Sequence, residues 1–312
     1  MKPVFLSPGD VVDVLAPGFA CDRETLEGSA EWLLEKGFEP RIPRGLFGRD
    51  ALSANGDARR AQHLIEALRA PDSTGVWCLR GGYGSIRLLP FLRAVRRPKR
   101  QKLLIGLSDI STLLIHLDQA WGWPSVHGPL LDRFAAGRVK PLWEREMLRL
   151  VSGQLGRLEH AGLRPMNRAA ADPRTAPVRA IVTGGNLITL QSSFGTPWAW
   201  RTAGRILFFE ELGERGYRID RALTQMRQSG AFRRARAVIF GDFLGGDEPG
   251  GGTRVQAVLK RFADESEFPV FRGLRTGHGE VQRPLVVGLS GTLDLGARGR
   301  LVQIVGAAPG PP

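Results

Sequence analysis

The stretch LLIGLSD, residues 103–109, is the most informative part of the sequence. Its apolar start indicates a buried strand, and the residues after it place apolar side chains three and four apart, which is typical of a helix. Ser108 therefore falls on a sharp strand-to-helix turn, with the backbone N–H of Asp109 at the helix start. Such a turn can present a nucleophilic Oγ and stabilise an oxyanion beside it.

Ser108 also has a purely structural interpretation. A Ser-Asp pair at such a turn is a common helix cap, and the strict G-x-S-x-G pattern of a nucleophile elbow is incomplete here. A nucleophilic serine needs a general base, and a neutral imidazole is the usual one at neutral pH. The positions of the histidines therefore bear on the choice.

The chain has five histidines. His278 is the best candidate base, because it lies between two glycines in the loop RTGHGE, where a ligand can approach the backbone closely. His127 ends a short extended segment and is a possible site residue. His63 and His116 fall within helical patterns that predict packing roles, and His160 lies in a polar, irregular stretch.

Two acidic residues follow an apolar strand pattern at residues 205–209. Glu210 and Glu211 would be costly at the end of a buried strand unless they are paired or positioned for chemistry. Side chains alternate along a strand, so only one of the two can share a face with the site. The residues alone do not choose between them, and a structural salt bridge is an alternative for either one.

A glycine-rich loop, RGGYGS at residues 80–85, lies between an apolar stretch and a helical pattern. A loop of this kind can hold phosphate at a helix N-terminus, but it has neither the P-loop nor the dinucleotide-binding pattern. It could also be a simple turn. We favour a loop that binds substrate backbone, with Tyr83 as a side wall.

Taken together in chain order, these segments resemble the LD-carboxypeptidases, a serine peptidase family that includes muropeptide-recycling enzymes and microcin-immunity peptidases. The resemblance covers nearly the whole chain. The segments are GDVVDVLAP at 9–17, RGGYGS at 80–85, GLSD at 106–109, GGNL at 184–187, LFFEE at 207–211, YRIDR at 217–221 and GHG at 277–279.

The resemblance implies a catalytic triad of Ser108, Glu210 and His278, with Glu210 chosen over its neighbour. It also implies an oxyanion hole formed by the backbone N–H groups of Asp109 and Gly82. The family reaction releases the terminal D-alanine from murein tetrapeptides in peptidoglycan recycling. Substrate-binding positions are then expected in the glycine-rich loop, at Arg80, Gly81 and Tyr83.

The family resemblance leaves two other functions open. A microcin-immunity-type peptidase, which cleaves aminoacyl-nucleotide substrates, shares the triad, and a non-catalytic binder of murein peptides would share the cleft. The chain also departs from the family pattern at Gly18, where a serine usually follows Ala-Pro. Arg80, Arg218 and Arg275 are unranked candidates for binding the substrate carboxylate.

Composition is ordinary for a soluble globular protein, with 42% hydrophobic and 24% charged residues. The net charge of +13 is spread along the chain without a nucleic-acid-binding motif, so we expect no nucleic acid partner and a murein peptide as substrate. Cys21 and Cys78 have no metal-ligand spacing, and serine chemistry needs no metal or organic cofactor. We see no signal peptide and no membrane-spanning run, which favours a cytoplasmic protein. Family resemblance implies a homodimer.

The pattern of elements predicts an α/β protein with two domains. Residues 1–151 alternate strands and helices and should form a mainly parallel sheet flanked by helices, which carries the serine. Residues 152–178 are polar and rich in Arg, Gly and Pro, and are predicted to be a linker. Residues 179–312 should form a second, smaller α/β domain with the glutamate and histidine. The active site would then lie at the domain interface.

Overall fold

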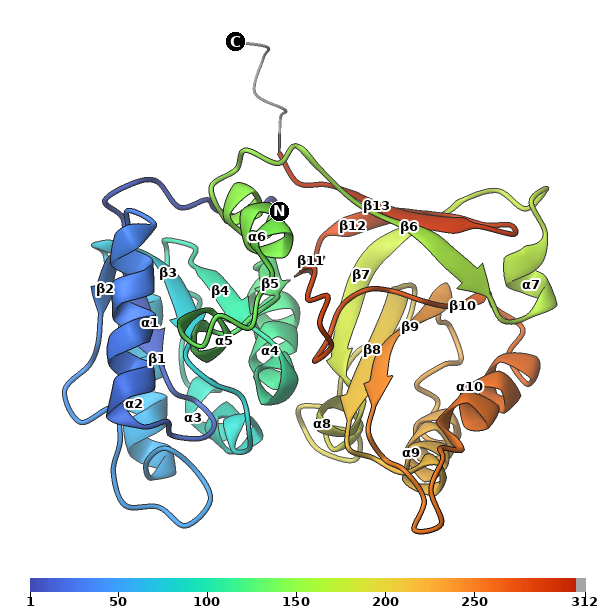
Figure 1. Ribbon diagram of the computed structural model, residues 1–312, viewed down its shortest axis with the longest axis horizontal. Helices are drawn as coiled ribbons and strands as arrows, with labels where there is room; N and C mark the ends of the chain where they lie inside the picture. The colour runs from blue at the N-terminus through green and yellow to red at the C-terminus, as the bar shows by residue number, and fades with distance from the viewer. Residues whose placement is uncertain (307–312) are drawn as a thin grey trace.

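The strands of the protein form two sheets that lie side by side in the computed structural model, which describes residues 1–306 (Figure 1). The first sheet has the strand order β11-β5-β4-β3-β1-β2. Its strands are β1 (Val11–Leu15), β2 (Glu39–Arg41), β3 (Ser73–Cys78), β4 (Leu103–Gly106), β5 (Ser125–His127) and β11 (Leu285–Val287). β1 to β5 are parallel, and β11 is antiparallel to β5.

Helices flank this first sheet, as the sequence pattern predicts. Asp22 caps the first helix, because its side chain accepts a hydrogen bond from the Thr25 backbone N–H at 2.8 Å. The helices are α1 (Arg23–Glu35), α2 (Asp57–Arg69), α3 (Leu89–Leu92), α4 (Ser111–Trp121), α5 (Leu131–Ala135) and α6 (Pro141–Val151), and short 3₁₀ turns span Ser85–Leu88 and Ser108–Ile110. The predicted α/β class is confirmed.

The strand order places two loops together. After β1 the chain moves outward to β2 and then returns to β3 on the other side of β1, so the connections after β1 and β3 diverge. In open α/β sheets, ligands bind in the crevice at such a switch point, beyond the carboxyl ends of the strands. Here the Phe19 backbone N–H donates to Gly81 O at 2.8 Å, which joins the loop after β1 to the loop after β3.

The second sheet is a closed barrel with the order β10-β6-β13-β12-β7-β8-β9. Its strands are β6 (Arg157–Pro165), β7 (Val178–Asn186), β8 (Ile206–Leu212), β9 (Ala237–Leu244), β10 (Val270–Arg272), β12 (Ser290–Asp294) and β13 (Gly299–Ile304). Its helices are α7 (Arg168–Ala171), α8 (Leu187–Gln191), α9 (Gly216–Gln228) and α10 (Val255–Asp264). The strands β7, β8, β9 and β10 are parallel to one another.

The prediction of a linker at residues 152–178 is wrong. This segment contains β6 and α7, and β6 pairs with β13 and β10 as part of the barrel. Its polar composition hid the strand, because buried side chains such as Leu158 and Leu163 alternate with exposed charged ones. A register shift and the left-handed Gly162 (φ +77°) also interrupt the alternation of period two.

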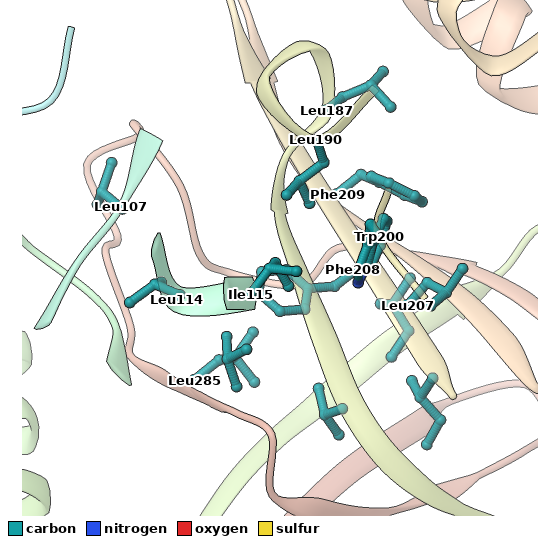
Figure 2. Close-up of a cluster of buried hydrophobic side chains, with 14 of the residues drawn as sticks. Leu107, Leu114, Ile115, Leu187, Leu190, Trp200, Leu207, Phe208, Phe209 and Leu285 are labelled. Atoms are coloured by element: carbon teal, nitrogen blue, oxygen red, sulfur yellow. The ribbon is translucent and has the colours of Figure 1, made fainter. Parts of the chain in front are cut away.

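A continuous apolar core joins the two sheets. Leu107 and Leu114 from the first half belong to the same buried cluster as Phe208 from the barrel (Figure 2). Leu285 of β11 also lies in this cluster, although β11 belongs to the first sheet and comes from the C-terminal part of the chain. The two halves are therefore packed together rather than joined by a tether. No helix within residues 1–306 combines the length and hydropathy needed to cross a bilayer.

Candidate active site

Ser108 has the backbone conformation of a nucleophile elbow. Its φ of +65° is the only positive value among the non-glycine residues of 1–306. A serine in this left-handed region costs on the order of 1 kcal/mol or more, and such strain is typical of functional sites. Gly106 permits the turn, since a Cβ there would lie 2.7 Å from the Ile110 side chain. The predicted sharp turn is therefore present.

The glycine-rich loop lies directly against this turn. A Cβ on Gly81 would be 3.0 Å from Ser108 Cβ and 3.3 Å from its Oγ. The Asp109 carboxylate holds the loop in place by accepting hydrogen bonds from the backbone N–H groups of Gly84 (3.2 Å) and Ser85 (2.9 Å). Burial raises the pKa of Asp109 despite these hydrogen bonds. Its side chain therefore has a structural role that the sequence pattern does not predict.

Glu210 and His278 form a buried pair across the barrel end. Glu210 Oε2 lies 2.6 Å from His278 Nδ1, and the carboxylate is inaccessible to solvent. Glu210 is carried by β8, whereas His278 is carried by the loop between β10 and β11. Gly277, with φ of +121°, allows the loop to approach so closely that a Cβ there would be 2.9 Å from Glu210 Cβ.

The contact between Glu210 and His278 shifts the pKa of each of the two groups. Burial opposes ionisation of Glu210, but the imidazoles of His127 and His278 outweigh burial and hold the pKa of this carboxyl well below its usual range. Burial alone would lower the pKa of His278, and the hydrogen bond and charge of Glu210 outweigh it, so this pKa is raised. A carboxylate with this partner fixes the imidazole tautomer, with the proton on Nδ1 and Nε2 free to act as a base.

Glu211 has a different role from its neighbour. Its Oε1 accepts from Asn186 Nδ2 and from its own strand at Leu212 N, and its Oε2 accepts from Ile188 N at the start of α8, all at 2.9 Å. Burial raises the pKa of Glu211 to about 7. The structure therefore assigns Glu210 to the histidine and Glu211 to the fold.

One hydrogen bond links the helix of the serine to the barrel. Asn186 N donates to Ser111 Oγ at 3.1 Å, and Asn186 is the register partner of Glu210 in the β7–β8 pair. The first turn of α4 thus lies next to the strands that carry the acid. Among the hydrogen bonds within residues 1–306, none joins Ser108 Oγ to His278.

Comparisons with known proteins cover both halves of the chain. Residues 12–128 match the LD-carboxypeptidase N-terminal domain and residues 179–293 match the LD-carboxypeptidase C-terminal domain. The murein tetrapeptide carboxypeptidase of Pseudomonas aeruginosa is 30% identical, over 91% of this chain and 92% of that protein. The chain belongs to the LD-carboxypeptidase family.

Solved structures and a second type of relative agree with this family assignment. The muramoyltetrapeptide carboxypeptidase of Oxalobacter formigenes has a similar fold, with a TM-score of 0.80, 26% identity, and coverage of 96% of this chain and all of that one. The microcin C7 self-immunity protein MccF of Escherichia coli is 27% identical, over 93% of this chain and 92% of that protein. The chain is therefore similar to both kinds of family member.

The departure of the chain from the family pattern at Gly18 has a steric reason. A Cβ at position 18 would lie 2.3 Å from Gly81 O and 3.1 Å from Asp109 Oδ2. The backbone after β1 therefore packs against the glycine-rich loop, where a side chain would not fit. The buried Arg60 strengthens the same region by donating to the carbonyl oxygens of Pro17, Asn55 and Gly84. Nothing in the sequence singled out Arg60 among so many arginines.

Three further groups lie close to the pair of Glu210 and His278. His127, a possible site residue from sequence, approaches Glu210, with Nε2 at 3.9 Å from Oε1. Asp242 accepts from Gly279 N at 3.2 Å, and burial raises its pKa to about 6. Arg133 was not predicted; its charge acts on His278, and its Nε is buried with no hydrogen-bond partner within residues 1–306.

The predicted substrate-binding side chains are more exposed. Tyr83 is 42% exposed, as a side wall of an open site would be. Arg80 is half-exposed, with Nε 3.9 Å from Asp132 Oδ2. Arg218 contacts the Tyr217 hydroxyl at 3.1 Å and Glu214 at 3.5 Å. These contacts leave Arg80 freer than Arg218 to bind a ligand.

Proposed function

We propose that this protein is a serine LD-carboxypeptidase that releases the terminal D-alanine from murein tetrapeptides, as part of peptidoglycan recycling. The observation that carries the proposal is the 2.6 Å contact between Glu210 Oε2 and His278 Nδ1, in a chain whose Ser108 has the strained backbone of a nucleophile elbow. The murein tetrapeptide carboxypeptidase among its relatives supports this substrate.

The proposed reaction follows the serine-triad scheme. Ser108 Oγ attacks the scissile carbonyl while His278 Nε2 takes the hydroxyl proton. His278 then protonates the leaving amine, which departs as D-alanine and leaves an acyl-enzyme. Water, deprotonated by the same imidazole, releases the shortened peptide. Glu210 remains ionised throughout and stabilises the imidazolium, which is consistent with its lowered pKa.

The tetrahedral intermediates need donors for the oxyanion. In our proposal these are the backbone N–H groups of Asp109, at the start of the 3₁₀ turn, and of Gly82. The close approach of Gly81 to Ser108 supports this assignment, because it brings the loop backbone to the nucleophile. Arg80, Gly81 and Tyr83 would then bind the substrate along the same loop.

The substrate ends in a carboxylate, so the site needs a cation near the leaving group. We assign this role to Arg133. Its guanidinium is partly buried, which lowers its pKa, and its Nε has no partner within the described residues. A carboxylate would satisfy that donor through the planar contact that arginine makes well. Arg275 is less suitable, because its charge already acts on the carboxylate of Asp242.

A second candidate function is cleavage of aminoacyl-nucleotide substrates, which the 27% identity to a microcin self-immunity protein favours. The chemistry at Ser108 would be the same, and only the group held beyond the scissile bond would differ. The two functions are therefore separated by substrate and not by mutation of the triad.

The test is a mass-spectrometric assay of the purified protein with disaccharide-tetrapeptide. We expect loss of one D-alanine, and a drop in turnover of at least about 1000-fold in Ser108→Ala, as when a triad member is removed. Ser152→Ala, at the half-buried C-terminal end of α6, is the matched control and should keep full activity. An intact tetrapeptide together with a cleaved aminoacyl-nucleotide would favour the second function. No cleavage of either would favour a murein-peptide binder.

A further inference from the structure

His127 belongs to the first sheet but contacts the acid of the barrel. It is the last residue of β5 and the register partner of Gly106, two residues before Ser108. Its side chain is inaccessible to solvent, and Nε2 lies 3.9 Å from Glu210 Oε1. His127 thus connects the strand that leads to the nucleophile with the carboxylate that orients the base.

The two facing atoms are the unsatisfied ends of otherwise satisfied groups. Glu210 Oε2 contacts His278 Nδ1 at 2.6 Å, and His127 Nδ1 contacts Thr276 Oγ1 at 3.2 Å. In contrast, Glu210 Oε1 and His127 Nε2 are both buried without a hydrogen-bond partner within residues 1–306. Buried polar atoms are rarely left unpaired, because each costs about 1–3 kcal/mol. Glu210 Oε1 and His127 Nε2 lie 3.9 Å apart, so each is a potential partner for the other.

The neighbouring hydroxyl determines where the protons of His127 lie. Thr276 Oγ1 donates to the carbonyl oxygen of Arg283 at 2.8 Å, so it can only accept from His127 Nδ1. Nδ1 therefore carries a proton. A neutral ring would then direct the lone pair of Nε2 at a carboxylate oxygen, and this repulsion is strong in a buried site. A second proton, on Nε2, turns the repulsion into an attraction between opposite charges.

We propose that His127 is protonated on both ring nitrogens in the resting enzyme, so that its Nε2–H faces Glu210 Oε1 as the cation of an ion pair at 3.9 Å. His127, Glu210 and His278 then form one array, with an imidazole on each carboxylate oxygen. His127 is a positioning residue, because it acts through Glu210 and does not touch the substrate. Its role in turnover rests on the proposed function, whereas its protonation does not.

The array has a consequence for the catalytic base. The positive charge of His127 offsets part of the negative charge of Glu210, so His278 is less stabilised as an imidazolium and can remain a neutral base. Other charged groups act on His278: Glu211 and Asp242 near the pair, and the opposing Arg133 on α5. These groups are unchanged when His127 is replaced, so its effect can be isolated.

The first experiment measures protonation directly by nitrogen-15 NMR of histidine-labelled wild-type enzyme without substrate. Near neutral pH, we expect both ring nitrogens of His127 to give the shifts of protonated nitrogens. A His127 Nε2 with the shift of an unprotonated nitrogen would overturn the proposal. This readout is independent of substrate, so it stands even if the murein tetrapeptide is not cleaved and the proposed function fails.

The second experiment follows the titration of His278 by NMR in His127→Gln and His127→Leu. Gln keeps a hydrogen-bond donor toward Glu210 without the positive charge. The Gln variant also allows the measurement if the Leu variant does not fold. We expect the midpoint of His278 to rise by about one pH unit in either variant, since one unit is an ordinary charge–charge effect. An unchanged midpoint in a folded variant would refute the role of His127.

A matched control is His160→Gln. His160 is also a buried histidine, but its Nε2 bonds to Pro284 O at 3.0 Å, and burial lowers its pKa to about 3. This variant should lower stability without moving the His278 midpoint. If the tetrapeptide is a substrate, kcat should fall roughly tenfold in His127→Gln with KM unchanged, as expected for an effect on proton transfer. A rise in KM alone would contradict a positioning role.

Discussion

The two sides of the proposed active site are built in different ways. On the side of the first sheet the site depends on backbone geometry: Ser108 is held at φ +65°, and Gly81 allows the glycine-rich loop to pass within contact of it. On the barrel side the site depends on side-chain charge: Glu210 is buried and paired with an imidazole. Substitutions on the first side should therefore act through shape, and those on the second through protonation.

The largest effect is expected from removing the charge on the barrel side. Glu210→Gln keeps the size of the side chain, but its amide can donate to His278 Nδ1 and so favour the wrong tautomer. We expect kcat to fall by about 10⁴-fold, the loss seen when a serine triad loses its acid charge. Steady-state kinetics with the tetrapeptide measures this loss. A decrease of less than tenfold would exclude Glu210 as the orienting acid.

The next effect tests shape on the side of the first sheet. In Gly81→Ala the added methyl would lie 3.0 Å from Ser108 Cβ, so the glycine-rich loop must move by a few tenths of an ångström. We expect kcat to fall by roughly 100-fold, similar to loss of one oxyanion donor. Gly56→Ala is the control, because its Cβ would meet nothing within 4 Å. If Gly81→Ala changes the pH dependence of kcat instead of its value, substitutions on this side do not act through shape. The proposed distinction between the two sides is then wrong.

Arg133→Met is expected to have a smaller effect. Without the guanidinium, the substrate carboxylate loses a charge-assisted partner, and KM should rise about tenfold with little change in kcat. The acid limb of the kcat/KM profile should also move to higher pH, because Arg133 opposes the raised pKa of His278. The exposed Arg23→Met, on α1, serves as control and should leave both quantities unchanged. An unaltered KM would reject the assignment of Arg133.

The sequence predicted the two sides unequally. The elbow could be predicted, because an apolar run followed by helical spacing is a local signal at Ser108. The choice of Glu210 could not be made from residues alone, because it depends on where α8 begins and which oxygen meets Asn186. β6 was missed for a related reason: its polar residues face outward, and only the pairing with β13 identifies it as a strand. Local patterns predict elements, whereas contacts between distant segments assign roles.

The smallest effect on activity is expected at Glu211, which shares a strand with Glu210 and has the opposite pKa shift. Burial raises the pKa of Glu211 from 4.5 to about 7. Between these values the folded protein binds a proton that the unfolded chain has released, so the free energy of unfolding falls as pH rises and levels off above about pH 7. Glu211→Gln cannot titrate and should lose this part of the slope. His278 and Asp242 titrate in both proteins, so the difference between them isolates Glu211.

Thermal unfolding at pH 5 and pH 8 measures this difference. Between pH 5 and pH 8 the Tm of the wild type should fall further than that of Glu211→Gln. At pH 5 the variant should have the lower Tm, because one acceptor of the α8 N–H groups is gone. Turnover should remain within a few-fold of wild type, since His278 keeps its partner. Equal losses of Tm in the two proteins would mean that Glu211 is ionised throughout this range, and that its hydrogen bonds outweigh its burial.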